Sequence, residues 1–297
     1  MRQPLAIFAC LLALLGWAAP AAAAEVKRDY LDIGGGIEIH YREAGEGRPL
    51  LFVPGWTFSS AIFEHQLSGL SDAYRVIAID PRGQGKSTKV LEGADYVTHA
   101  EDLAKVVAAL ELQDVVLIGW SFGCLETYGY IKLEGLDKVA AHVCIDLPPK
   151  TLSTNPDDWV EGPLDDIAGA YHPFLRDQKG QRAFITWYTD EVMVQRELAP
   201  EEMHAIVDQS IETSHVVAAA LFASGMFTNN LPEAKLLDEK AVPALNVVAE
   251  HWGETAKAYL GRELPGSRVE ILGGHMMFWE YPDAFNALLA AFLEGVK

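Results

Sequence analysis

The sequence predicts an α/β fold in which a mostly parallel sheet is covered by helices on both faces. Short apolar runs alternate along the chain with longer segments of helical period, and this alternation is typical of parallel strands joined by helices. Most of the short runs are apolar at nearly every position, which indicates strands that are buried on both faces. The alternation stops between about residues 150 and 242, where helix formers and aromatic residues dominate.

The expected strands and core helices follow in chain order. Residues 37–45 alternate between polar and apolar side chains after the glycines at 34–36, which predicts an exposed edge strand within a hairpin. Six buried strands are expected at 49–55, 74–80, 114–120, 138–146, 243–250 and 267–274. Amphipathic helices are expected at 98–112 and at 282–295, where Pro282 suits a first helical turn.

Residues 150–242 are expected to form a helical cap inserted into a core made of residues 25–149 and 243–297. The cap helices are expected at 157–175, 181–195, 200–210 and 214–223. A chain of about 270 residues after the N-terminal segment can build one large domain with such an insertion.

The first 24 residues have the composition of a secretory signal peptide. Arg2 supplies an early positive charge, residues 5–17 are apolar, and small residues follow up to Ala24. Cleavage is expected after one of the alanines at 22–24, and an uncleaved N-terminal anchor is the alternative. We therefore expect a periplasmic or secreted protein that has no stable membrane association after cleavage.

Charge and cysteine content narrow the class of partner. The formal net charge is −19 and the sequence has no cluster of basic residues, which disfavours nucleic acids and anionic lipid surfaces as partners.

Beyond the signal segment only Cys124 and Cys144 remain, so stability should come from the core and not from a disulfide framework. Both lie in apolar segments, where we expect buried free thiols, with a disulfide between them as the alternative.

The motif GWSFG at 119–123 is the strongest chemical signal. It follows the apolar run VVLI and precedes a helical segment, the context of a nucleophile elbow that presents Ser121 at a helix N-terminus. A serine hydroxyl needs a base, and His275 has the required place, in a loop between the last strand and the last helix. The oxyanion donors are expected from backbone position to be the N–H groups of Trp56 and Phe122.

Four segments together resemble the α/β-hydrolase fold superfamily: LLFVPGWTFSSAIFEHQL, VIAIDPRGQGKS, LIGWSFG and GGHMMFWEYPDAF. Within it, the chain is most similar to the small esterase, perhydrolase and lactonase branches. The resemblance covers the mature chain outside the cap. It implies an eight-stranded, mostly parallel sheet flanked by helices with a helical cap. One departure is Pro54-Gly55, which stands where His-Gly is usual.

The third triad member is not in its usual place. The stretch NVVAEHWGET has no aspartate after the strand, and its acids, Glu250 and Glu254, are alternative candidates. Zearalenone-lactonase-like hydrolases instead carry an acid at the end of the strand that follows the nucleophile helix. By resemblance to them, Asp146 is the expected acid, and its task is to accept the imidazole N–H and fix the tautomer of His275.

These residues predict a serine hydrolase that cleaves an apolar small-molecule carboxylic ester or lactone through an acyl-enzyme. The sequence implies no metal and no organic cofactor. Perhydrolysis, C–C bond hydrolysis on the same triad, and non-catalytic ligand binding are the alternatives. Nine side chains are candidates for an apolar acyl pocket: Trp56, Phe122, Trp159, Trp187, Tyr188, Phe222, Met226, Phe227 and Met276.

Overall fold

The computed structural model describes residues 25–297, and the predicted signal peptide at 1–24 lies outside the described residues. Eight strands form one sheet in the order β1-β2-β4-β3-β5-β6-β7-β8, which confirms the predicted eight-stranded sheet. The first two strands, β1 (Lys27–Asp32) and β2 (Glu38–Ala44), run antiparallel, and the other six run parallel to one another. Those six are β3 (Pro49–Val53), β4 (Arg75–Ile79), β5 (Val115–Trp120), β6 (Val139–Ile145), β7 (Ala244–Val248) and β8 (Arg268–Ile271).

The prediction that residues 37–45 form an edge strand is wrong. β2 pairs with β4 on one side and with β1 on the other, so β1 is the edge. The sequence KRDYLD of β1 is mostly polar, and every residue except the partly buried Leu31 is exposed, because an edge strand that is largely uncovered needs no continuous apolar pattern.

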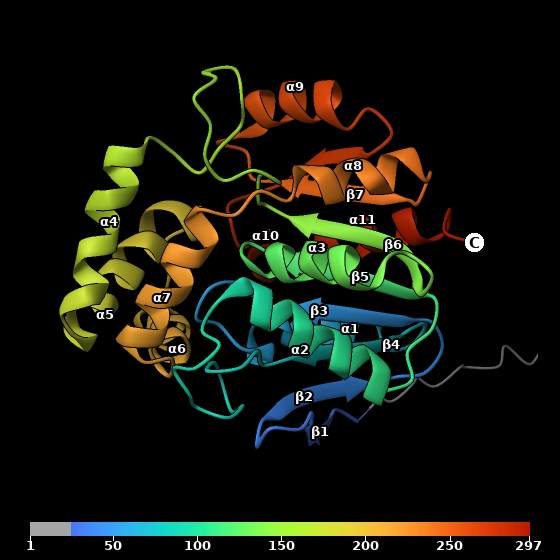
Figure 1. The fold of residues 1–297 in the computed structure, drawn as a ribbon, viewed down its shortest axis with the longest axis horizontal. Coiled ribbons are helices and arrows are strands. Elements are labelled where there is room, and N and C mark those ends of the chain that lie inside the picture. The colour runs from blue at the N-terminus through green and yellow to red at the C-terminus, as the bar shows by residue number, and fades with distance from the viewer. Residues whose placement is uncertain (1–24) are drawn as a thin grey trace, which may run out of the picture.

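Helices cover both faces of the sheet (Figure 1). One face packs against α2 (Tyr96–Ala109), α3 (Gly123–Glu134), α8 (Leu231–Glu239) and α9 (Gly253–Glu263), and the other against α1 (Glu64–Leu70), α10 (Met277–Glu280) and α11 (Pro282–Leu293). In β3, Leu51 and Val53 join the first hydrophobic cluster while Leu50 and Phe52 join the second. Successive side chains of a strand point to opposite faces, so an unbroken apolar run was the correct signal for burial on both.

Four cap helices lie together to the left of the sheet in Figure 1: α4 (Leu164–Arg176), α5 (Gln178–Tyr188), α6 (Pro200–Ile211) and α7 (His215–Met226). A π-helical turn, Thr189–Met193, continues α5. The helix predicted at 157–175 begins only at Leu164, because Gly162 has a φ of +153° that a helix does not allow and Pro163 is extended. The helix α8 was not predicted, and it packs against α3 of the core.

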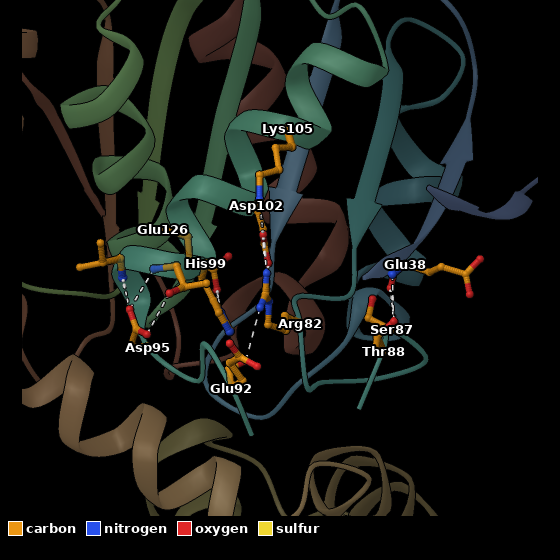
Figure 2. Close-up of polar contacts among 12 residues, drawn as sticks. Glu38, Arg82, Ser87, Thr88, Glu92, Asp95, His99, Asp102, Lys105 and Glu126 are labelled. Atoms are coloured by element: carbon orange, nitrogen blue, oxygen red, sulfur yellow. Dashed lines mark hydrogen bonds and ion pairs between the residues drawn. The ribbon is translucent and has the colours of Figure 1, made fainter. Parts of the chain in front are cut away.

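A polar network fastens the loop after β4 to the helices beside the nucleophile turn (Figure 2). Arg82 donates two hydrogen bonds to Asp102 of α2, at 2.7 and 2.8 Å. Asp95 caps the N-terminus of α2, and Nδ1 of His99 lies 3.0 Å from Oε1 of Glu126, which joins α2 to α3.

No helix in residues 25–297 is long and apolar enough to span a bilayer.

Candidate active site

Ser121 lies in the tight turn between β5 and α3 and has a left-handed backbone φ of +51°. The chain is crowded on both sides of it. A Cβ on Gly119 would lie 2.5 Å from Cα of Cys124, and one on Gly123 would lie 2.3 Å from the carbonyl oxygen of Val53. Only glycine fits at these two positions. The packed strands therefore hold Ser121 in a conformation that a serine on its own would avoid.

Asp146 lies directly after β6 and is buried, with 2% of its surface exposed. Its N–H donates to the carbonyl oxygen of Val247 at 2.8 Å, and its Oδ1 accepts from the N–H of Ala249 at 2.8 Å. Its Oδ2 lies 2.6 Å from Nδ1 of His275. These contacts hold the carboxylate in one orientation, facing the imidazole.

His275 lies in the loop between β8 and α10, and both the core and the cap hold it. Nε1–H of Trp120 donates to its carbonyl oxygen at 2.8 Å, and its own N–H donates to the carbonyl oxygen of Val192 at 3.2 Å. The ring of Tyr188 packs edge-on, with its centroid 5.7 Å away. Because Asp146 engages Nδ1, Nε2 is the nitrogen left to exchange a proton with a reacting group.

Ser121 and His275 line one cavity of about 380 Å³ between the core and the cap. Within the described part of the chain, no hydrogen bond joins Ser121 Oγ to His275, and such contacts commonly tighten when substrate binds. Nine of the twenty lining residues are aromatic: Trp56, Phe58, Trp120, Phe122, Phe184, Trp187, Tyr188, Phe222 and Trp252. An apolar cavity with a few convergent polar groups is the usual form of a small-molecule site.

Six of the nine predicted pocket residues line this cavity, and Trp159, Phe227 and Met276 do not. Trp159 and Met276 are buried elsewhere, whereas 72% of the surface of Phe227 is exposed. Aromatic content alone could not separate side chains that pack within the cap from those that face the cavity.

The two predicted oxyanion donors both border the cavity. Phe122 precedes the first residue of α3, and Trp56 follows the end of β3. Neither backbone N–H donates a hydrogen bond to another group in the described residues. The indole of Trp56 donates to the carbonyl oxygen of Ala218 in α7 at 2.7 Å, which fixes this loop against the cap.

The alternative acids lie at the surface. Glu250 and Glu254 are both exposed, and Oε2 of Glu250 accepts from Nε2 of Gln195 at 3.0 Å. Because Asp146 already occupies the Nδ1 side of His275, the geometry favours Asp146 over both glutamates as the orienting acid.

Cys124 and Cys144 form a disulfide, with their Cα atoms 5.6 Å apart. The expectation of free thiols was therefore wrong. The pairing of β5 with β6 sets Cys144 opposite Gly119, and the turn at Ser121 folds Cys124 back over Gly119. The bond joins the segment after Ser121 to the strand that ends before Asp146.

Glu161 is a site residue that sequence reasoning missed. It lies in the cap loop before α4 and lines the cavity, where its N–H donates to the carbonyl oxygen of Thr151 at 3.1 Å. Burial raises the pKa of Glu161 to about 7, while the charge of His275 lowers it and that of Asp146 raises it. In the sequence it is one of many acids, and no motif marks it.

The sequence profile of the α/β hydrolase fold family matches residues 48–282, and the chain belongs to this family. A protein of Synechocystis sp., provisionally named a non-heme chloroperoxidase, is 30% identical over 276 residues, which cover 87% of this chain and 95% of that protein. The bifunctional esterase/perhydrolase DCH of Acinetobacter calcoaceticus is 35% identical over 144 residues, 46% of this chain and 52% of that protein.

Among solved structures, a bromoperoxidase from Bacillus anthracis superposes with a TM-score of 0.80 at 24% identity, covering 90% of this chain and 100% of that one. At this identity the likeness shows the fold alone.

Among residues 25–297, no cluster of three or more His, Cys, Asp or Glu side chains is arranged to hold a metal ion.

Proposed function

We propose that the chain is an exported serine hydrolase that cleaves a carboxylic ester or lactone through an acyl-enzyme. The observation that carries this proposal is the convergence of three elements at one cavity. The strained turn of Ser121 and the loop of His275 both line it. Oδ2 of Asp146 lies 2.6 Å from Nδ1 of His275. Nucleophile, base and orienting acid are the parts that acyl transfer requires.

In the proposed reaction, Oγ of Ser121 attacks the ester carbonyl while Nε2 of His275 takes its proton. Asp146 accepts the Nδ1–H hydrogen bond and stabilises the imidazolium that forms. The N–H groups of Trp56 and Phe122 stabilise the oxyanion of the tetrahedral intermediate. His275 then protonates the departing alkoxide, and a water molecule releases the acid by the same route in reverse.

The test is turnover of p-nitrophenyl acetate and of longer p-nitrophenyl esters by the purified mature protein. We expect steady release of p-nitrophenol, and loss of this release in Ser121→Ala with an unchanged circular dichroism spectrum. A protein that gives neither a burst nor a steady rate would contradict the proposal and favour a ligand-binding role. A panel of lactones assayed beside the esters separates the two substrate classes.

Perhydrolysis on the same residues is a second candidate, supported by the similarity to the esterase/perhydrolase DCH. In this reaction hydrogen peroxide, instead of water, attacks the acyl-enzyme. The Oγ–acyl bond breaks, a peracid leaves, and His275 returns a proton to Ser121. Peracid measured by iodide oxidation, with an ester and peroxide both present and lost in Ser121→Ala, would support this activity, and ester cleavage without peracid would exclude it.

Export of the chain is proposed on the composition of residues 1–24, and the disulfide between Cys124 and Cys144 agrees with an oxidising compartment. The test is intact mass of the protein recovered from the periplasm or medium of the expressing cells. A mass that fits a start after one of the alanines at 22–24 is expected. Full-length protein confined to the cytoplasm would contradict export.

A further inference from the structure

We infer that Glu161 is a specificity-determining residue that selects substrates carrying a cationic ammonium group on an apolar body. This inference deepens the proposed function and rests on it, because the cavity concerned is the one that contains Ser121 and His275. It concerns the part of the substrate that does not react.

The charges around the cavity are unbalanced. Its acidic lining residues are Glu161, in the loop before α4, and Asp166, in α4. No Lys or Arg of the described chain lines it, and the carboxyl group of Glu161 has no hydrogen-bond or ion-pair partner among those residues. Glu161 is partly buried. A partly desolvated carboxylate without a partner is unfavourable, so a cationic ligand group would supply the missing partner.

The walls of the cavity also suit a cation. Aromatic rings from both the core and the cap line the same cavity as the acids, including Trp56, Phe184 and Trp187. A ring face attracts a cation electrostatically, and aromatic cages are a common means of binding quaternary ammonium groups. Aromatic walls together with an unpaired carboxylate favour a cation over an anion of the same shape. Anionic acyl groups, such as those of dicarboxylate monoesters, should be rejected.

The titratable groups that face Glu161 come from both the cap and the core. Asp166 and Tyr188 approach from the cap, and His275 with Asp146 behind it approach from the core. Tyr188 stays neutral because burial raises its pKa well above the usual value, with Glu161 and Asp146 adding to the rise. His251, in the loop after β7, has its pKa lowered by burial. Glu161 is therefore a cap residue that lines the cavity and changes its charge near neutral pH.

The experiment compares two pairs of esters of equal shape. The first pair is choline acetate and 3,3-dimethylbutyl acetate, in which a carbon atom replaces the ammonium nitrogen. The second pair consists of two p-nitrophenyl esters, one with a trimethylammonium group and one with a tert-butyl group at the end of the acyl chain. We expect kcat/KM for the cationic member of at least one pair to exceed that of its neutral partner by about tenfold above the pKa of Glu161, from the combined carboxylate and ring attraction.

The ratio of the two kcat/KM values isolates the charge of Glu161, because any group that both esters need for reaction affects them alike and cancels. The kcat/KM profile reports groups of the free enzyme. The ratio should therefore fall as the pH drops through about 7, where the carboxyl group of Glu161 becomes neutral, to the value that the ring attraction alone supports. In Glu161→Gln the ratio should be smaller than in the wild type and should no longer change with pH near 7, because the ring attraction remains and the carboxylate attraction is lost. Glu254→Gln, which removes an exposed acid outside the cavity, should retain the wild-type ratio.

A binding measurement keeps the test independent of turnover. Ser121→Ala should bind benzyltrimethylammonium in calorimetry, and the double variant with Glu161→Gln should bind it about tenfold more weakly. Ratios of one at every pH, or equal affinities in the two variants, would overturn the inference. If neutral esters are still cleaved in a Ser121-dependent manner, the proposed function survives that result. Failure of the wild type to cleave any ester overturns both.

Discussion

Asp146 and His275, separated by 129 residues in the chain, meet with Oδ2 and Nδ1 2.6 Å apart in a buried contact. Two structural features create this pair. Asp146 adopts a left-handed φ of +53° at the end of β6, and the N–H of Ala249 after β7 holds its second oxygen. The carboxyl ends of neighbouring parallel strands thus supply the acid, its anchor and the loop of the histidine at one edge of the sheet.

The first prediction concerns this pair. Asp146→Asn should lower kcat for p-nitrophenyl esters by roughly 10³- to 10⁴-fold, because an amide does not stabilise the required tautomer and imidazolium of His275. Glu254→Gln and Glu250→Gln are the matched controls and should stay within about twofold of wild type. Near-normal kcat in Asp146→Asn, with a large loss in either control, would move the role of triad acid to that glutamate.

The second prediction concerns strain at the nucleophile turn. Ser121→Gly and Ser121→Ala should both be inactive, but the glycine variant should be more stable by roughly 0.5–1 kcal/mol. A φ of +51° costs an L-residue about 1–2 kcal/mol, of which the greater freedom of unfolded glycine cancels part. Urea denaturation of the two variants measures the difference. A glycine variant less stable than the alanine variant would indicate a turn without strain.

The third prediction concerns pH and stability. Burial lowers the pKa of His142 in β6 to about 3, and Nε2 lies 2.8 Å from Oγ1 of Thr127. The unfolded chain therefore binds a proton at His142 that the folded chain does not, at pH values between about 3 and about 6.5. The free energy of unfolding should fall through this window as the pH falls, by up to about 1.4 kcal/mol per pH unit from this group.

His142→Gln should flatten this dependence, whatever its effect on stability at neutral pH. Urea denaturation across the acid range measures the slope, and the same exchange at the exposed His65 controls for the change of residue type. An unchanged slope in His142→Gln would mean that His142 does not stay neutral in the folded protein.

The fourth prediction concerns the disulfide. The bond between Cys124 and Cys144 spans 20 residues, and closing a loop of that size in the unfolded chain stabilises the fold by about 3 kcal/mol. Reduction should lower the Tm of the wild type. The double variant Cys124→Ala, Cys144→Ala should have a lower Tm than the oxidised wild type, and reductant should not change that Tm. A wild-type Tm that reductant does not change, with free thiols detected after unfolding in its absence, would contradict the bond.

The sequence determined the strands of the core well because they are buried on both faces. The six parallel strands lie within the predicted ranges, since a short continuous apolar run between helical segments is typical of a strand buried in a parallel sheet. β1 was expected only as the unnamed partner in the hairpin with residues 37–45, because an exposed edge strand carries no such signal. The helix α8 was missed because its nine residues are too few to show a clear helical period.

For the site, the sequence by itself determined the position of Ser121, through the glycines that its turn requires, and the candidate loop of His275. It reduced the acid to Asp146, Glu250 or Glu254 and could not choose by physics alone, because all three follow strands that end at the same edge. The tertiary structure decided which carboxylate faces Nδ1. It alone also decided the disulfide and the place of Glu161 in the cavity, because both depend on which distant segments are packed together.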